Sequence, residues 1–245
     1  MSIVSANNQT ETEPAANTVK AGLLAAWPIS LGYLPIGLSF GILAQQNGLK
    51  AWQVGLMSLL VFAGGSQFIA VAMLTAGASA VTIVATTFMV NLRHLLMSSA
   101  LSVHLPGVSR RFLALFAYGI TDESFVVNLE RFREKNWSRF SALILNQTAN
   151  AVWILSTIAG ALAGQFIPVG IMGMEYALSA MFICLLVFQL RSRIFVLTAL
   201  GAAGCALPLY LWLPGNAYIV VSACCAASLG FWLRRSTRRR EVHHA

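Results

Sequence analysis

Residues 51–76 read AWQVGLMSLLVFAGGSQFIAVAMLTA and contain no charged side chain. A helix of about 20 apolar residues spans the hydrocarbon core of a bilayer, so this run predicts a membrane-spanning segment. The pairs Gly64-Gly65 and Ser66-Gln67 lie near its midpoint. A helix interrupted at bilayer depth frees backbone groups that only protein or a water-lined cavity can satisfy, and this point is therefore a candidate functional break. The alternative is that the glycines only let helices pack closely.

Seven further apolar runs accompany this one. They cover residues 21–44, 79–103, 112–129, 140–166, 170–190, 194–213 and 215–233. The chain is therefore predicted to be an all-α polytopic membrane protein, a bundle of about eight transmembrane segments, or six to seven if a run is re-entrant or broken. The predicted parts are a disordered tail over residues 1–20, a transport domain over residues 21–233 and a basic tail over residues 234–245.

The composition excludes a water-soluble enzyme. Of 245 residues, 58% are hydrophobic and only 10% are charged, whereas a soluble domain is about a quarter charged. The net charge of +8 would suggest nucleic-acid binding in a soluble protein, but the basic residues lie almost entirely between the apolar runs and in the tail, so no nucleic-acid partner is predicted. The four cysteines lie in apolar runs without metal-ligand spacing, and neither a metal nor a cofactor is predicted. They are Cys184, Cys205, Cys224 and Cys225.

The basic residues also predict the orientation. Eight alternating crossings place both termini on one side of the membrane, together with twelve of the sixteen Lys and Arg residues. The other side carries Lys50, Arg110 and Arg111, and Arg93 lies inside a run. Because cytoplasmic loops are enriched in Lys and Arg, both termini are predicted to be cytoplasmic, with Arg110 and Arg111 as exceptions on the outer side.

The first run is rich in residues that interrupt helices. Pro28, Gly32, Pro35, Gly37 and Gly41 fall within fourteen residues. Broken helices mark substrate sites in transporters, so Pro35 is a candidate substrate-binding residue, and close helix packing is the alternative. No internal repeat between the two halves is evident.

Charged residues inside the third and fourth runs are the strongest indication of function. An ionisable group at the bilayer centre costs roughly 2.5–3.5 kcal/mol on insertion scales and is normally paired or turned towards an aqueous cavity. Consecutive runs are expected to be antiparallel neighbours, which brings Arg93 close to Asp122 and Glu123. One carboxylate is expected to pair with Arg93 and the other to face a cavity and carry a proton, since adjacent helix positions differ by about 100°. A purely structural ion-pair cluster is the alternative.

Other polar residues in the runs have two interpretations. His94 is either a proton relay or a hydrogen bonder between helices. Asn146, Gln147 and Asn150 either line the path or bond neighbouring helices, and neutral amides favour the structural role.

Four stretches together carry a family pattern: residues 32–41 (GYLPIGLSFG), 63–68 (AGGSQF), 91–94 (NLRH) and 118–125 (YGITDESF). Taken in this order, they resemble the large subunit of the AzlC-type branched-chain amino-acid exporters of bacteria, the AzlC/YgaZ-like family. The resemblance is strongest over residues 21–129. The recurrent polar groups of the family match Ser66, Gln67, Arg93, His94, Asp122 and Glu123, while Asn91 stands where some members have aspartate.

The resemblance implies a multi-pass permease of the bacterial inner membrane. It implies export of valine, leucine and isoleucine, in some cases methionine, driven by the proton gradient, and a small AzlD-type membrane subunit as partner. The resemblance is also compatible with a higher oligomer.

A mechanism follows as a hypothesis. Backbone amides beside Gly64, Gly65, Ser66 and Gln67, helped by Arg93, would bind the substrate carboxylate. Asp122 or Glu123 would accept the ammonium group and exchange it for a proton. The apolar wall is expected from residues such as Leu34, Phe40 and Phe68.

The same polar residues are compatible with two other functions. A passive channel or facilitator would use the same polar groups as a selectivity constriction. An intramembrane hydrolase would use Ser66 as nucleophile and His94 as base, but Phe68 stands where the elbow motif requires glycine.

Overall fold

The computed structural model describes residues 15–167 and 193–212, together with residues 176, 183, 186–187, 190, 221–222, 225–226 and 228–232. All regular elements in these parts are helices, which confirms the predicted all-α membrane class. Four are long and apolar enough to cross a bilayer: Asn17–Gln46, Ala80–Ser102, Arg139–Gly164 and Phe195–Trp212. Most of the expected spans 170–190 and 215–233, Cys184, Cys224 and the tail 234–245 lie outside the described residues.

The first helix, α1 (Ala15–Gln46), is continuous through Pro28 and Pro35. The expected interruption of this run does not occur, because proline in a membrane helix is tolerated where neighbouring elements satisfy the freed backbone groups. The helix begins at Ala15, so residues 15–20, placed in the N-terminal tail by the sequence, extend the first span.

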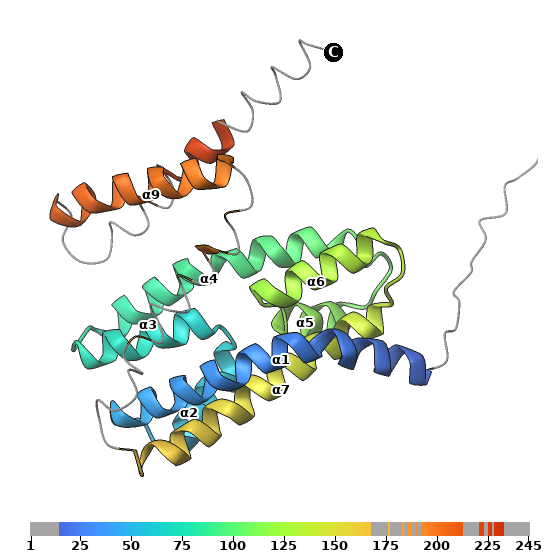
Figure 1. Ribbon diagram of the computed structural model, residues 1–245, viewed down its shortest axis with the longest axis horizontal. Helices are drawn as coiled ribbons and strands as arrows, with labels where there is room; N and C mark the ends of the chain where they lie inside the picture. Colours follow the sequence, from blue (N-terminus) through green and yellow to red (C-terminus); the bar gives the residue numbers. More distant parts are fainter. Residues whose placement is uncertain are drawn as a thin grey trace, which may run out of the picture.

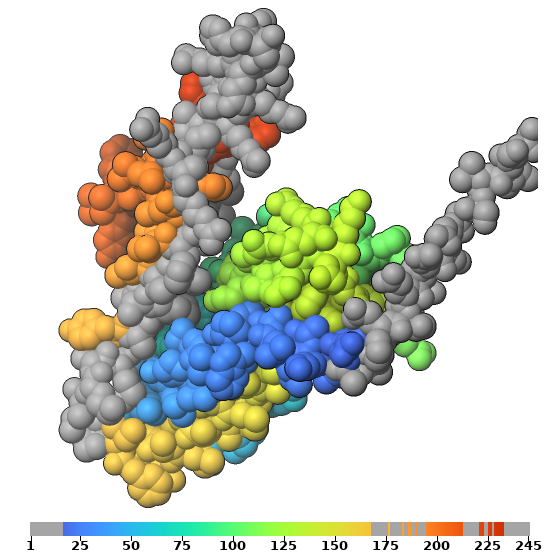
Figure 2. Space-filling view, turned by 45° about the vertical axis from the view of Figure 1, so that its right-hand side comes forward, coloured from blue at the N-terminus to red at the C-terminus, as the bar shows by residue number. Residues whose placement is uncertain are grey.

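Helix α7 (Arg139–Gly164) lies along α1 in the same direction. Ser141 Oγ donates to the Thr18 carbonyl at one end, and Gln46 Nε2 donates to the Ile167 carbonyl at the other. Figure 2 shows the two helices side by side, α1 in blue and α7 in yellow. Glycines allow this approach: a Cβ at Gly41 would overlap the Thr157 carbonyl oxygen.

The second apolar run is a re-entrant hairpin of α2 (Ala51–Val61) and α3 (Gly64–Thr75). Each arm is about 16–18 Å long at 1.5 Å per residue, roughly half of the 30 Å hydrocarbon core. The Thr75 hydroxyl bonds Asn47 Oδ1 at 2.9 Å, so α3 ends at the face from which α2 starts. The break at Gly64-Gly65 was predicted from the sequence; the full crossing of this run was wrong.

A second hairpin enters from the opposite face. Helix α4 (Ala80–Ser102) crosses the bundle and is followed by α5 (Arg110–Tyr118) and α6 (Asp122–Arg133). The start of α5 adjoins the start of α7, with the Phe112 and Phe140 rings 5.8 Å apart, and the end of α6 adjoins the end of α4, where His104 stacks on Phe132. Figure 1 shows the hairpins at opposite ends of the bundle, α2–α3 at the left and α5–α6 at the right.

The hairpins change which basic residues share a face. Because α5 starts beside α7, Arg110 and Arg111 lie on the face of Arg139 rather than opposite it. That face also carries Lys20 and the α6–α7 loop, whereas Lys50 lies on the other. The expected position of Arg110 and Arg111 on the face opposite Lys20 is therefore wrong, because it assumed that every run crosses the membrane.

Helix α9 (Arg193–Trp212) is the last long element described. It corresponds to the run expected at residues 194–213.

Candidate functional site

The tip of the first hairpin is a strained break in the backbone. Phe62 ends α2 in the left-handed region, with φ 37° and ψ 51°, which is uncommon for a bulky residue. Ala63 precedes α3 and provides no side-chain cap. The first amides of α3, at Gly64 and Gly65, therefore begin a helix without a capping side chain, and such an end carries a partial positive charge.

The tip of the second hairpin, by contrast, is capped. Thr121 precedes α6, its Oγ1 accepts from the Ser124 amide at 3.3 Å, and Ser124 Oγ accepts from the Thr121 amide at 2.9 Å. This reciprocal capping box fixes the helix start. Asp122 and Glu123 occupy the first turn, where the helix dipole favours negative charge.

The two tips meet at a pocket in the middle of the bundle. Tyr118 donates its hydroxyl to the Leu59 carbonyl, and the Phe62 and Tyr118 rings lie 6.2 Å apart. The cavity itself is small, about 40 Å³, and together with the open solvent in front of it the space is about 470 Å³. Its lining comes from α1, both tips, α4 and α7: Tyr33, Ile36, Phe62, Ala63, Gly64, Gly65, Arg93, His94, Thr121, Asp122, Glu123 and Trp153.

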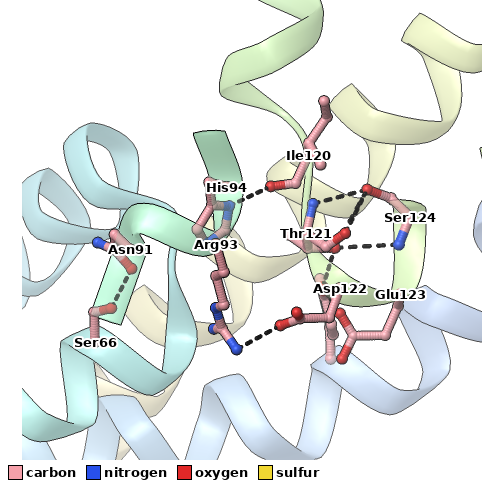
Figure 3. Close-up of polar contacts among 10 residues, drawn as sticks. Ser66, Asn91, Arg93, His94, Ile120, Thr121, Asp122, Glu123 and Ser124 are labelled. Carbon is pink, nitrogen blue, oxygen red and sulfur yellow. Dashed lines mark hydrogen bonds and ion pairs between the residues drawn. The ribbon is translucent and has the colours of Figure 1, made fainter. Parts of the chain in front are cut away.

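An ion pair crosses the pocket. Arg93 Nη1 of α4 lies 2.8 Å from Asp122 Oδ2, and the two side chains are 32% and 26% exposed. Figure 3 shows this pair beside Glu123. Arg93 Nε is buried and has no hydrogen-bond partner in the described part of the chain. The expected approach of Arg93 to the two carboxylates is present in the structure.

Glu123 has a different partner, which sequence reasoning missed. The Tyr33 hydroxyl of α1 lies 2.7 Å from Glu123 Oε2 and 2.7 Å from Thr121 Oγ1. Tyr33 is buried and packs edge-on against Trp153, with ring centroids 5.4 Å apart. Tyr33 is 90 residues from Glu123 in the sequence, and the only signal for it is its place in the stretch 32–41 that resembles the family.

His94 contributes a free nitrogen. Its Nδ1 lies 2.9 Å from the Ile120 carbonyl oxygen, which can only accept, so Nδ1 carries a hydrogen. Among the described residues, its buried Nε2 has no hydrogen-bond partner. In neutral histidine this nitrogen is an acceptor, and the side chain lines the pocket.

Gln67 lies behind the pocket. It is fully buried, donates Nε2 to Ser58 at 3.0 Å and accepts from Trp153 Nε1 at 2.8 Å. It thereby holds the Trp153 ring against the first tip, where a Cβ at Gly64 would come within 2.8 Å of that ring. Its amide is satisfied by these partners, so the geometry gives it a supporting position.

Ser66 and Pro35 also lie outside the lining. Ser66 donates its hydroxyl to Asn91 Oδ1 on α4, as Figure 3 shows, and this bond joins α3 to α4. In the described structure Ser66 bonds Asn91 and not His94, so the hydrogen bond between nucleophile and base that a hydrolase requires is not present there. Pro35 is exposed on α1, and its carbonyl accepts from Ser39.

The expected apolar wall is built from different residues. Leu34 is 49% exposed, whereas Phe40 and Phe68 are fully buried against each other beneath the site. Apolar side chains of the lining belong to Ile36, Phe62 and Trp153.

Amides of α7 satisfy the broken end of α5. Asn146 Nδ2 donates to the Phe116 carbonyl at 3.1 Å, and Gln147 Nε2 donates to the Leu115 carbonyl at 3.0 Å. Asn150 Nδ2 donates to the Tyr118 hydroxyl. The last carbonyls of a helix have no partner within it, so these contacts agree with the structural interpretation of the three amides.

The site therefore presents groups of both charges and apolar surface in one cavity. An anion is favoured by Arg93 and the open start of α3, and a cation is favoured by Asp122 and Glu123. Such a cavity can bind a small zwitterion, and its free acceptors can also bind protons.

Comparisons with known proteins bear on the whole of this region. A family model described as "AzlC protein" matches residues 28–167, a range that contains both hairpins and every residue of the pocket lining. No solved structure matches the chain.

Relatives are found in both bacteria and archaea. The chain is 26% identical over 219 residues to "Branched-chain amino acid transport protein AzlC" of Bacillus subtilis, covering 88% of this chain and 85% of that protein. It is 28% identical over 229 residues to "Inner membrane protein YgaZ" of Escherichia coli, covering 89% and 94%. An "Uncharacterized membrane protein" of Archaeoglobus fulgidus is 29% identical over 216 residues, covering 87% and 94%.

Proposed function

The chain belongs to the AzlC family of membrane transporters, and on that premise we propose that it exports branched-chain amino acids in exchange for protons. The observation that carries the proposal is the pocket between the two hairpin tips, which combines a guanidinium, two carboxylates and apolar side chains. A zwitterionic aliphatic amino acid requires these three kinds of group.

The carboxylate of the amino acid would bind at the start of α3. Its uncapped amides form the partly positive end of a helix, and Gly64 and Gly65 at this end belong to the lining of the pocket. Arg93 adds a full positive charge from α4. Ser66 and Gln67 would support this subsite from behind, through Asn91 and Trp153.

The ammonium group of the substrate and the transported proton would compete for the carboxylates of Asp122 and Glu123. Glu123 is held by the Tyr33 hydroxyl and Asp122 by Arg93. When the substrate carboxylate binds Arg93, Arg93 moves away from Asp122. The Asp122 carboxylate is then available to bind the substrate ammonium group. A proton taken from outside would then displace the amino acid, and His94 Nε2 offers an acceptor beside the pair. Alternate occupation by ammonium and proton couples the two fluxes in opposite directions.

The substrate side chain would lie against Ile36, Phe62 and Trp153. An apolar wall distinguishes hydrophobic side chains of similar size only weakly, which suits a set of valine, leucine and isoleucine, with methionine as a further substrate. The printed name of the Bacillus subtilis relative supports this substrate class.

The face of Lys20, Arg110, Arg111 and Arg139 would be cytoplasmic, in the inner membrane of a bacterium. Within residues 15–167, Lys50 is the one basic residue on the opposite face, as the enrichment of Lys and Arg in cytoplasmic loops predicts. Helices α1, α4 and α7 then cross the membrane. With the three crossings that the sequence predicts over residues 170–190, 194–213 and 215–233, both termini would be cytoplasmic.

A small AzlD-type subunit is proposed as the partner. The family resemblance suggests this partner, and many apolar side chains of α4 are exposed, including Val81, Val84, Phe88, Leu95 and Leu96. Lipid alone would also cover them, so the requirement is tested by reconstitution with and without the subunit. Larger assemblies of the pair are compatible with this proposal.

Efflux of radiolabelled isoleucine from proteoliposomes under an imposed proton gradient tests the proposal. We expect gradient-dependent efflux in the presence of the small subunit. In Asp122→Asn or Glu123→Gln the efflux rate should fall at least about tenfold, because a positioned side chain that transfers a proton contributes about 10²-fold or more to the rate of a step that needs it. Glu130→Gln is the matched control, because Glu130 lies on the same helix outside the pocket lining.

The other outcomes are equally specific. An efflux rate that does not depend on the proton gradient would identify a facilitator. Isoleucine efflux that stays coupled to the proton gradient in both carboxylate variants would refute the exchange scheme. Isoleucinamide, which lacks the carboxylate, should not compete with isoleucine. No isoleucine efflux with the partner present would refute the proposed substrate.

A further inference from the structure

Residues 22–75 and 80–133 repeat the same order of elements, a long helix followed by a hairpin. The bounds of α6 are those of α3 displaced by 58 residues at both ends, from 64 to 122 and from 75 to 133. The first arms, α2 and α5, begin at residues 51 and 110. Because the hairpins enter from opposite faces, the two segments form a repeat of inverted topology, an architecture of many secondary transporters.

Equivalent positions on the two long helices each bond the hairpin of the other repeat. Tyr33 on α1 and Asn91 on α4 are separated by the same 58 residues. Tyr33 bonds Thr121 and Glu123 at the tip of the second hairpin, and Asn91 accepts from Ser66 just behind the tip of the first. Each long helix thus holds the hairpin of the other repeat, although the two side chains differ in chemistry.

We propose that Tyr33 and Asn91 are paired positioning residues that latch the two hairpins, and that releasing one latch opens the pocket to one face of the membrane. The hairpin α5–α6 reaches the pocket from the face of Arg110, and α2–α3 reaches it from the face of Lys50. Release at Tyr33 therefore opens the pocket to the face of Arg110, and release at Asn91 opens it to the face of Lys50.

Besides the latches, the two hairpins have other contacts. The tips touch each other through Tyr118 and the Leu59 carbonyl, and α4 also bonds the second tip through the Arg93–Asp122 ion pair and the His94 bond to the Ile120 carbonyl. The first tip is backed by the buried Gln67 and Trp153, and the second tip by Asn146 and Asn128. Two separately supported elements around one pocket are what alternate opening requires.

Side-specific thiol labelling tests this inference. The reporter is Ala63→Cys, a pocket position, in a chain whose four native cysteines are replaced by serine, studied in right-side-out and inverted membrane vesicles with a membrane-impermeant maleimide. We expect Tyr33→Phe to raise the labelling rate about fivefold from the face of Arg110, and Ser66→Ala to raise it about fivefold from the face of Lys50. Fivefold is what the loss of one ordinary hydrogen bond does to an equilibrium.

Matched controls separate a latch from a general loosening. Ser99→Ala removes a hydroxyl that bonds only within α4 in the described structure and should leave both rates unchanged. Asn91→Ala tests the first latch from its other end and replaces Ser66→Ala if that variant is poorly produced. Tyr33→Phe keeps the ring packed on Trp153.

Opposite sidedness of the two variants supports the inference. Equal increases from both faces, increases from the same face, or no change would overturn it. The measurement needs no amino acid and does not depend on the proposed substrate, so a failure of isoleucine transport and a failure of the latches are seen separately.

Discussion

Asp122 and Glu123 are neighbours in the chain but bind different partners. Asp122 pairs with Arg93 of α4, and Glu123 bonds Tyr33 of α1. Adjacent positions of a helix differ by about 100°, and this alone predicts that the two carboxylates face different elements. It does not tell which carboxylate takes the arginine, because that depends on how α4 and α6 are placed around the pocket.

Removing one member of the ion pair should destabilise the protein more than removing both. Asp122→Asn leaves Arg93 without its counter-ion in a partly buried place, and we expect a loss of about 1–3 kcal/mol, less than for a fully buried pair. The double variant Arg93→Gln, Asp122→Asn should recover most of this loss. Thermal unfolding in detergent measures both, with Glu130→Gln as the control.

A pair that is only a surface contact would give another result. In that case Asp122→Asn would unfold at the wild-type temperature, and the effects of the two single variants would simply add in the double variant.

At the scale of the helix, α1 and α7 show how small residues set the distance between elements. Gly37, Gly41 and Gly160 lie where the two helices touch, and Gly32 on α1 has open space around its Cβ position. The sequence shows five prolines and glycines in this stretch without telling packing glycines from the others. Close approach, rather than a broken helix, is what the glycines provide here.

Gly41→Ala should therefore be much more harmful than Gly32→Ala. The added methyl group at Gly41 would clash with the Thr157 carbonyl oxygen and the Ala161 amide nitrogen. Because backbone atoms cannot rotate away as a side chain can, we expect a loss of about 1–3 kcal/mol in the free energy of unfolding. Gly32→Ala should be neutral or slightly stabilising. Thermal unfolding of the two variants compares them, and equal stability would contradict the packing of α1 on α7.

The two hairpins differ in how far the sequence reveals them. The first break is marked by a glycine pair followed by polar residues. The second lies at Gly119, Ile120 and Thr121, where one glycine precedes an ordinary N-cap. An apolar run with a short polar insertion has the same composition whether the chain crosses the membrane or turns back, so composition does not reveal the second break.

At the scale of the molecule, the hairpins decide the topology. Cysteine labelling checks it: Arg110→Cys should be modified from the same face as Asn136→Cys in the α6–α7 loop, and Lys50→Cys from the opposite face. Eight alternating crossings would instead place Arg110 with Lys50. An impermeant maleimide applied to right-side-out vesicles distinguishes the two, and labelling of Arg110→Cys together with Lys50→Cys would refute the re-entrant second hairpin.

The sequence by itself determined that the protein lies in a membrane, that its fold is all-α, and which charged residues form the centre of the candidate site. Long apolar runs have few alternatives to helices in a bilayer, since every backbone group must be bonded within the protein, and charges inside such runs must find one another or water. These conclusions depend on local composition, and for that reason the sequence is enough to single out Arg93, His94, Asp122 and Glu123.

Only the tertiary structure decided which apolar runs cross the bundle and which turn back, which residues line the pocket, and how the segments 22–75 and 80–133 correspond. Tyr33 and Trp153 reach the site from helices far along the chain, whereas Gln67, Ser66 and Pro35 lie behind it or away from it. The physical reason is that direction and contact are set by packing between distant segments. The inverted repeat is likewise a relation of directions and lengths, which two segments can share with almost no residues in common.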